Sequence, residues 1–267
     1  MAKSKPKKLL WLIILLVVSC VIIIFALGYL VFIKFSNQPK TVQNSQTPQV
    51  TTQSPLASSG FSSVLGSAFG QYNTMSQTRY QHKTSVNSTA GTYFYDCVGF
   101  VNYSLGQSAQ IANTEVRTTE HIPSGRIPSP AHYLEFFQQL STTQYPGWQP
   151  VSKVADIQPG DILAWVNEPN NVDEKGHAVI AAGPPQQVSA NTFQIAVIDS
   201  TGTPHGPDDT RITNPHNLLG PNGKPSGLGI GTIGIDADPA NGKPVAIHWS
   251  ISTKAVLLPI GIGRPLR

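Results

Sequence analysis

Cysteine is scarce in this chain of 267 residues, which contains only Cys20 and Cys97. Cys20 lies in an apolar N-terminal run and Cys97 in the more polar remainder, so no disulfide bridge is expected between them. Charge is also scarce, at 12% of residues, whereas glycine and proline number 23 and 22. This composition favours a loop-rich β or α+β domain over a helical bundle. Cys97 therefore stands out as a thiol without a cysteine partner.

Several short motifs that identify an enzyme class are missing. The sequence has no Gly-x-Ser-x-Gly turn of a serine hydrolase, no His-Glu-x-x-His zinc helix and no Gly-x-x-x-x-Gly-Lys phosphate loop. From residue 61 onward, twelve basic residues accompany fourteen acidic ones, so there is no basic surplus for binding nucleic acid. Asp236-Ala237-Asp238 lacks the rest of a calcium loop and is expected to be a turn. We expect no metal, no cofactor and no nucleic-acid partner.

A long apolar run occupies the N-terminal region. Residues 9–33 contain no charged side chain, a length sufficient for a helix to span a bilayer. Four lysines precede the run and only two follow it closely, so the positive-inside rule predicts a cytoplasmic tail at 1–8, a transmembrane signal anchor at 9–33 and a C-terminal domain outside the cytoplasm. The polar residues 34–60 are expected to form a flexible linker. The alternatives are a cleaved signal peptide and a lipoprotein box that ends at Cys20.

Residues 61–267 are expected to form the folded domain. Helices are predicted at 61–77, from Cys97 to about residue 105, and at 130–140, where Ser129 can cap a helix that starts with Pro130. Apolar runs predict strands at 161–166, 177–183, 193–199, 229–235, 244–251 and 255–262. This order indicates an α+β domain whose helices pack on an antiparallel sheet of about six strands. The stretch from Asp208 to Arg211 is expected to be a solvated loop with a local ion pair.

The segment around Cys97 combines a helix start with a thiol. Asp96 is a suitable N-cap residue, and Val98, Val101 and Leu105 follow at the spacing of one buried helix face. A cysteine in the first turn of a helix experiences the positive end of the helix dipole, which favours the thiolate. The pattern therefore predicts an activated nucleophile, and a buried structural cysteine is the alternative.

A thiol nucleophile needs a base and a residue that orients the base. His177 opens a predicted strand, and Asp199 ends the next one, so the two become neighbours if these strands form a hairpin. His248 lies within a predicted strand and is the rival base. The other histidines lie in loops or on a helix and are expected to be solvated or hydrogen-bonded: His82, His121, His132, His205 and His216.

Three motifs resemble the NlpC-type, papain-like cysteine peptidases of bacterial cell walls. Asp96-Cys97-Val98-Gly99-Phe100-Val101 is similar to the start of their nucleophile helix. The stretch 158–165, Gln-Pro-Gly-Asp-Ile-Leu-Ala-Trp, is similar to the strand that precedes their histidine. The stretch 176–183, Gly-His-Ala-Val-Ile-Ala-Ala-Gly, is similar to their histidine strand. Val98 departs from the small polar residue usual after the cysteine, and Asp199 departs from the family's third position, which is often histidine.

The resemblance implies a papain-like fold and a bacterial, membrane-anchored hydrolase that cleaves amide bonds in peptidoglycan stem peptides or other peptides. Cys97 would attack the carbonyl, His177 would protonate the leaving amine, and Asp199 would orient His177. Tyr80 and Tyr95 are candidate substrate contacts because they precede the cysteine closely. Two alternatives stay open: a non-catalytic wall-binding module on the same fold, and a thiol acyltransferase or amidase that acts on another substrate.

Overall fold

The computed structural model describes residues 63–167 and 176–266. The described residues all belong to one unit of the chain, residues 57–267. The expectations for the tail at 1–8, the anchor at 9–33, the linker at 34–60 and lipid on Cys20 fall outside the described residues.

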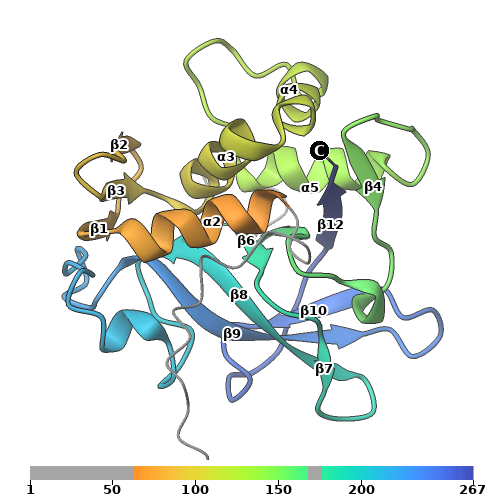
Figure 1. Ribbon diagram of the computed structural model, residues 1–267. Coiled ribbons are helices and arrows are strands. Elements are labelled where there is room, and N and C mark those ends of the chain that lie inside the picture. Colours follow the sequence, from red (N-terminus) through yellow and green to blue (C-terminus); the bar gives the residue numbers. More distant parts are fainter. Residues whose placement is uncertain (1–62, 168–175, 267) are drawn as a thin grey trace, which may run out of the picture. The chain divides into compact units, whose positions relative to one another are not determined.

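Along the described residues, four helices and a small sheet come first (Figure 1). The helices are α2 (Ser63–Thr74), α3 (Cys97–Ser108), α4 (Gln110–Thr119) and α5 (Pro130–Gln139). The small sheet has the order β1-β3-β2 and consists of β1 (Gln77–Tyr80), β2 (Ser85–Asn87) and β3 (Thr92–Tyr95). Its strands occupy much of the stretch between α2 and α3, and only Asp96 separates the end of β3 from Cys97 at the start of α3.

The large sheet has nine strands, and all of its pairings are antiparallel. Its order is β11-β10-β9-β8-β6-β5-β12-β4, and β7 pairs with β8. The strands are β4 (Trp148–Pro150), β5 (Ile162–Val166), β6 (Gly176–Ala181), β7 (Gln186–Gln187), β8 (Thr192–Thr201), β9 (Gly227–Ala237), β10 (Pro244–His248), β11 (Val256–Leu257) and β12 (Ile260–Pro265). Two short 3-10 helices, η1 (Val154–Asp156) and η2 (Thr210–Ile212), lie in the connections.

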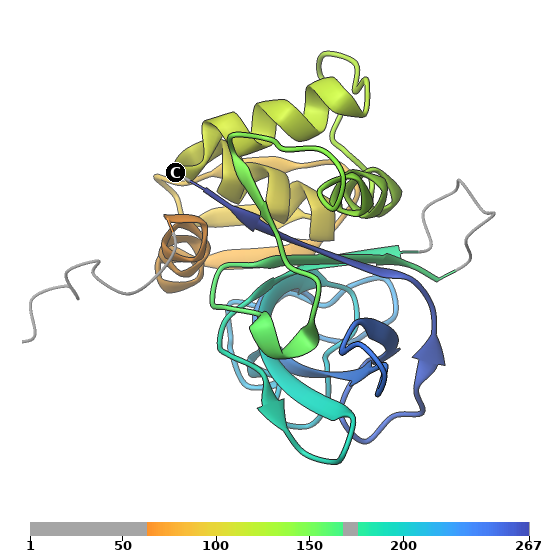
Figure 2. The ribbon, with the colours of Figure 1, turned by 90° about the vertical axis from the view of Figure 1, so that its right-hand side faces the viewer.

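Both faces of the central strands are buried, which explains why β5 and β6 are continuous apolar runs in the sequence. Successive side chains of a strand point to opposite faces. Ile162 and Ala164 pack beneath the helices, whereas Leu163 and Trp165 join a second core on the other face. Figure 2 shows the helices on one side of the sheet and the curved strands of the second core on the other.

The Pro-Gly-Asp turn before β5 has a structural role. Gly160 has φ +96°, a conformation that favours glycine. The Asp161 carboxylate accepts two hydrogen bonds from Arg264, at 2.7 and 2.9 Å, and one from the backbone N–H of Gln158 at 2.8 Å. The turn thereby fixes β12, which carries Arg264, beside β5.

The expected fold class is wrong. The described residues are mostly β, with a nine-stranded antiparallel sheet and a three-stranded sheet instead of one sheet of about six strands. The six predicted strands correspond to β5, β6, β8, β9, β10 and the segment of β11 and β12. The missed strands β1, β2, β3, β4 and β7 have only two to four residues each, too few for a clear alternation of polar and apolar side chains.

The expectation of a single-pass membrane protein with an external C-terminal domain finds no support in the part of the chain that the structure describes. Across 63–167 and 176–266, none of the helices has the length and apolar character needed to cross a membrane.

Candidate active site

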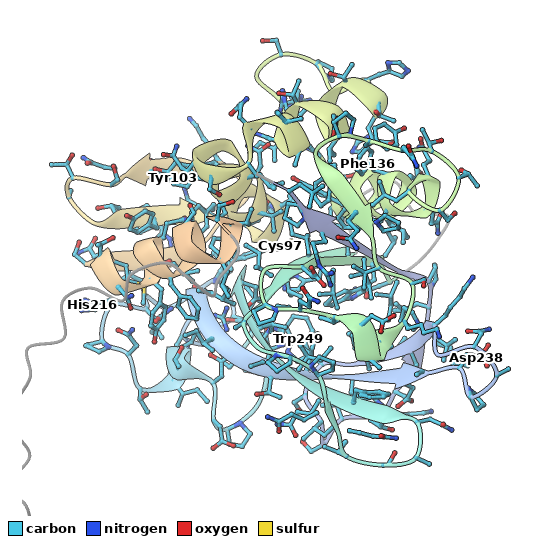
Figure 3. All side chains as sticks on the ribbon, turned by 45° about the vertical axis from the view of Figure 1, so that its right-hand side comes forward. Cys97, Tyr103, Phe136, His216, Asp238 and Trp249 are labelled. Atoms are coloured by element: carbon cyan, nitrogen blue, oxygen red, sulfur yellow. The ribbon has the colours of Figure 1, made fainter. Side chains whose placement is uncertain are left out.

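Cys97 is the first residue of α3, and Asp96 is its N-cap, as the sequence predicts. The Asp96 carboxylate accepts the backbone N–H of Gly99 at 2.8 Å. Cys97 is 3% exposed, and its sulfur accepts backbone N–H groups of Ala178 and Val98. Because Ala178 follows His177 in β6, this contact places the thiol beside the histidine-bearing strand. Figure 3 shows Cys97 between the helices and the strands.

The charge state of Cys97 differs from the expected thiolate. Burial, followed by the negative charge of Asp96, raises the pKa of the thiol. The N–H groups of Ala178 and Val98 oppose this effect but do not outweigh it. Cys97 is therefore a neutral thiol at rest, and it needs a base when it acts as a nucleophile.

His177 lies on β6 and contacts Asp199 on β8. The two strands pair with Ile180 opposite Ile198, so His177 and Asp199 lie diagonally across the pair on one face. His177 Nε2 lies 2.5 Å from Asp199 Oδ2. The ring packs edge-on against Trp249, with 5.1 Å between centroids, and against Trp165, with 5.4 Å. Since Nε2 faces Asp199, Nδ1 is the ring nitrogen turned away from this carboxylate.

Burial, the largest cause, lowers the pKa of His177, although contact with Asp199 raises it in part. The positive charges of His205 and Arg211 lower it further. A neutral imidazole on His177 and a neutral thiol on Cys97 are the resting states that these directions give.

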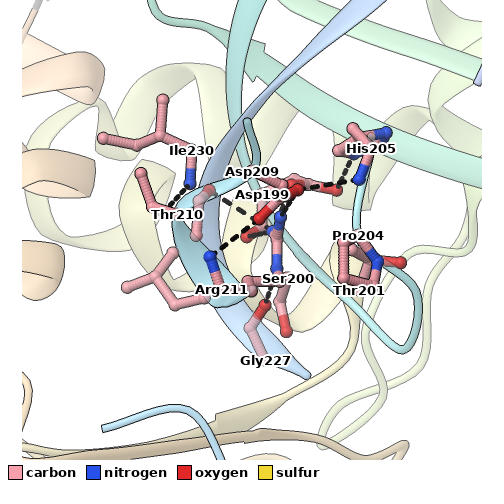
Figure 4. Close-up of polar contacts among 12 residues, drawn as sticks. Asp199, Ser200, Thr201, Pro204, His205, Asp209, Thr210, Arg211, Gly227 and Ile230 are labelled. Atoms are coloured by element: carbon pink, nitrogen blue, oxygen red, sulfur yellow. Dashed lines mark hydrogen bonds and ion pairs between the residues drawn. The ribbon is translucent and has the colours of Figure 1, made fainter. Parts of the chain in front are cut away.

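Asp199 is the centre of a buried polar network (Figure 4). His205 Nε2 lies 3.0 Å from Asp199 Oδ2, the oxygen that also contacts His177. Arg211 Nη2 donates to Oδ1, and to the Asp199 backbone carbonyl at 2.5 Å. Burial alone would raise the pKa of Asp199, but Arg211, His205 and the hydrogen bonds from both histidines together hold it well below its usual value. Asp199 is therefore an ionised carboxylate.

Arg211 joins this carboxylate to a second one. Its Nη1 donates to Asp209 Oδ2 at 2.7 Å, and its Nε donates to the carbonyl of Gly227 at 2.7 Å. Asp209 Oδ2 also accepts the backbone N–H of His205 at 2.8 Å. The expected ion pair between Asp209 and Arg211 thus exists, but both side chains are fully buried. The prediction that this loop is solvated is wrong for these two residues.

The glycines of β9 make room for this network. A Cβ on Gly229 would lie 2.5 Å from Arg211 Cγ, and one on Gly231 would lie 2.7 Å from Asp209 Oδ2. In the sequence, this glycine-rich stretch gives no sign of the site because its partners come from another part of the chain.

Two histidines and an aspartate within reach of one another also suggest a metal site. The ligand atoms of His177, Asp199 and His205 all lie within 4.8 Å of one another. The guanidinium of Arg211, however, is already paired with Asp199, and each histidine contacts the carboxylate directly. A cation at this point would face a fixed positive charge. The residues therefore fit a hydrogen-bonded network better than a metal centre.

The two candidate substrate contacts have different places in the structure. Tyr95 is fully buried, and its hydroxyl donates to Gln71 Oε1 at 2.9 Å, which removes it from the residues that a substrate can reach. Tyr80 is half-buried and lines an open cavity of about 480 Å3. His82, which also lines this cavity, lies 3.4 Å from Asp96. The full lining is Arg79, Tyr80, Gln81, His82, Leu219, Gly220 and Pro221.

Sequence reasoning missed several residues around the candidate pair. His205 and Arg211 lie in segments assigned to solvated loops, and Trp249 follows β10. Tyr133 of α5 is fully buried, and among the described residues its hydroxyl has no hydrogen-bond partner. Burial raises the pKa of Tyr133. Only the unusual density of His, Asp and Arg between 205 and 211 could have indicated this site.

Comparison with known proteins gives one distant relative. No family model matches the chain, and no solved structure matches it. The chain is 26% identical over 215 residues to "Uncharacterized protein R653" of Acanthamoeba polyphaga mimivirus, an alignment that covers 70% of this chain and 88% of the viral protein. Because the name of the viral protein states no function, the likeness carries no information on activity.

Proposed function

We propose that this protein is a cysteine hydrolase that cleaves amide bonds, with peptidoglycan stem peptides as its substrate class. The observation that carries the proposal is the 2.5 Å contact between His177 Nε2 and Asp199, beside a thiol that contacts the next residue of β6. A nucleophile, a base and an orienting carboxylate are the three parts that such a reaction requires. The peptidoglycan substrate rests on the resemblance of the motifs around Cys97, Asp161 and His177.

In the proposed reaction, His177 Nδ1 takes the thiol proton while Cys97 Sγ attacks the amide carbonyl carbon. The backbone N–H of Cys97, in the first helical turn, lacks an acceptor within the helix and is placed to stabilise the oxyanion. His177 then gives its proton to the leaving nitrogen, the carbon–nitrogen bond breaks, and a thioester remains. Water attacks the thioester, and His177 takes a proton from it. The carbon–sulfur bond then breaks, the acid is released, and His177 returns its proton to the Cys97 sulfur, which restores the thiol.

Peptide release from purified peptidoglycan tests the proposal. Wild-type protein should produce new amino termini, and Cys97→Ser and His177→Gln should reduce the rate by at least about a hundredfold, as expected for loss of a nucleophile or general base. His248→Gln is the matched control, since His248 also contacts a carboxylate of the large sheet, and it should keep the wild-type rate. Release by Cys97→Ser at the wild-type rate would refute the proposal.

One observation favours a second candidate, a non-catalytic wall-binding module. Cys97 is almost inaccessible and its pKa is raised, as in a structural cysteine. This candidate predicts that both wild type and Cys97→Ala sediment with insoluble peptidoglycan while neither releases peptides. An acyltransferase or amidase with another substrate would instead lose its activity in Cys97→Ala when other amides and acyl acceptors are offered.

A further inference from the structure

His205 has a hydrogen-bond acceptor at each of its ring nitrogens. Nε2 lies 3.0 Å from Asp199 Oδ2, and Nδ1 lies 2.9 Å from the backbone carbonyl oxygen of Trp249. A neutral imidazole has one N–H donor and one nitrogen that accepts. A carbonyl oxygen cannot donate, and Asp199 is surrounded by donors that favour its ionised form. Both ring nitrogens must therefore donate if both contacts are hydrogen bonds.

The charges around His205 lead independently to the same protonation state. Asp199, Asp209 and Arg211 are fully buried and would together carry a net negative charge if His205 were neutral. An unbalanced charge in a protein interior is costly. The side chain of His205 is fully buried beside Asp199, and its positive charge would make this group of four neutral.

We infer that His205 carries protons on both ring nitrogens in the folded protein and is a fixed cation that positions Asp199 for its contact with His177. His205 does not touch the thiol or a substrate, so its role is that of a positioning residue. It acts through the carboxylate oxygen that both histidines share.

The consequence for the reaction rests on the proposed function. Two cations on Asp199 reduce the stabilisation that this carboxylate can give to a protonated His177. The groups that face His177 are Asp199, His205 and Arg211, together with the uncharged rings of Trp165 and Trp249. Asp199 thus fixes the ring in the form with hydrogen on Nε2, while Nδ1 remains a base. Cys97 and His177 form a neutral pair that transfers its proton only as the carbonyl is attacked.

The protonation of His205 is measurable without a substrate. In full-length protein labelled with 15N-histidine, long-range 1H–15N correlation spectra at neutral pH should show two protonated nitrogens for His205 and one for His177. His205→Gln identifies the signals by their loss, and His205→Asn serves this purpose if the glutamine variant does not fold. An unprotonated ring nitrogen on His205 at neutral pH would overturn the inference.

A second measurement separates a positioning role from a merely structural one. In His205→Gln, the amide can still donate to Asp199 but has no charge, so the His177 ring should titrate at a higher pH than in wild type. His248→Gln, the matched variant at the other histidine–aspartate contact, should leave the titration unchanged. A variant that only lowers the melting temperature, with the titration of His177 unmoved, contradicts the positioning role.

The two proposals fail in different ways. A protein with a doubly protonated His205 that releases no peptide from peptidoglycan, or from other amides, overturns the proposed function alone. An active hydrolase whose His205 carries a single ring proton overturns the inference about His205 alone.

Discussion

Two aspartates of the large sheet each contact a histidine, in surroundings of different polarity. Asp199 on β8 contacts His177, and Asp236 on β9 contacts His248 Nε2 at 3.1 Å. The second pair is the more open one, with side-chain exposures of 15% for His248 and 27% for Asp236, against 7% and 0% for the first pair. Asp236 has a hydroxyl group, that of Thr192, as its further partner at 2.7 Å.

The neighbours of the carboxylates differ more than the histidine contacts themselves. Asp199 has Arg211 and His205 beside it, and Arg211 in turn bonds Asp209. A charge that water can reach needs little protein support, whereas a buried charge needs counter-charges and fixed donors. The comparison shows that a histidine and an aspartate in contact do not by themselves define a candidate site. The network that keeps the aspartate ionised and oriented distinguishes His177 from His248.

Removing the guanidinium of Arg211 should have the largest effect on stability. Arg211→Met leaves Asp199 and Asp209 buried without their shared cation, and the loss of one partner from a buried ion pair costs about 3–5 kcal/mol of unfolding free energy. Urea denaturation followed by circular dichroism measures the change. In His248→Gln, the same measurement should change by less than about 1 kcal/mol because water reaches that pair. Equal losses in the two variants would remove the energetic distinction between the sites.

Adding a methyl group beside Arg211 or beside His248 should have a smaller effect on stability. The Cβ in Gly229→Ala would lie 2.5 Å from Arg211 Cγ and 2.9 Å from Arg211 Nε, within a fully buried network. Overpacking of this kind costs about 1–3 kcal/mol. In Gly234→Ala, the new atom would meet His248 Cβ at 3.0 Å, where a partly exposed side chain can move aside. Thermal unfolding should therefore show a clear loss for Gly229→Ala and a smaller one for Gly234→Ala, and the reverse order would contradict this account.

The pH dependence of stability should also distinguish His177 from His248. Burial lowers the pKa of His177 below its usual value of 6.5, so the unfolded chain binds a proton there that the folded protein does not. Stability should therefore fall as the pH drops below about 6.5, and this contribution should vanish at higher pH. Denaturation midpoints at a series of pH values measure the slope. His177→Gln should flatten it and His248→Gln should not, so an unchanged slope in His177→Gln would show that His177 is not the group responsible.

Local sequence signals predicted the parts of the site that depend on neighbouring residues. Asp96 caps the helix that begins at Cys97, and Ser129 accepts the N–H of His132 where α5 begins with Pro130. The apolar runs of β6 and β8 indicated their strands, and the hairpin pattern placed His177 near Asp199. These features follow from capping and from the two-residue period of strands, which a single sequence displays.

The rest of the site depends on long-range packing that no local pattern contains. His205 and Arg211 lie in a segment rich in glycine, proline and aspartate, which is typical of a solvated loop. Their burial depends on β9 passing close by, with Gly229 and Gly231 opposite them. The same limit applies to the thiol, since the helix dipole predicted a lowered pKa and burial raised it. Burial is a property of the assembled domain, and here it outweighed the local effect.

The smallest stability effect is expected for Asp236→Asn. The asparagine oxygen can still accept from Thr192, and only the attraction to a partly exposed histidine is lost, so unfolding should change by less than about 1 kcal/mol. Peptide release by Asp236→Asn should stay at the wild-type rate. Asp199→Asn should reduce the rate strongly, because the carboxylate charge that orients His177 is lost. Rates measured side by side on one peptidoglycan preparation test this pair of variants. If Asp236→Asn were the inactive one, His248 would be the base, and the buried network around Asp199 would be a structural support of the sheet.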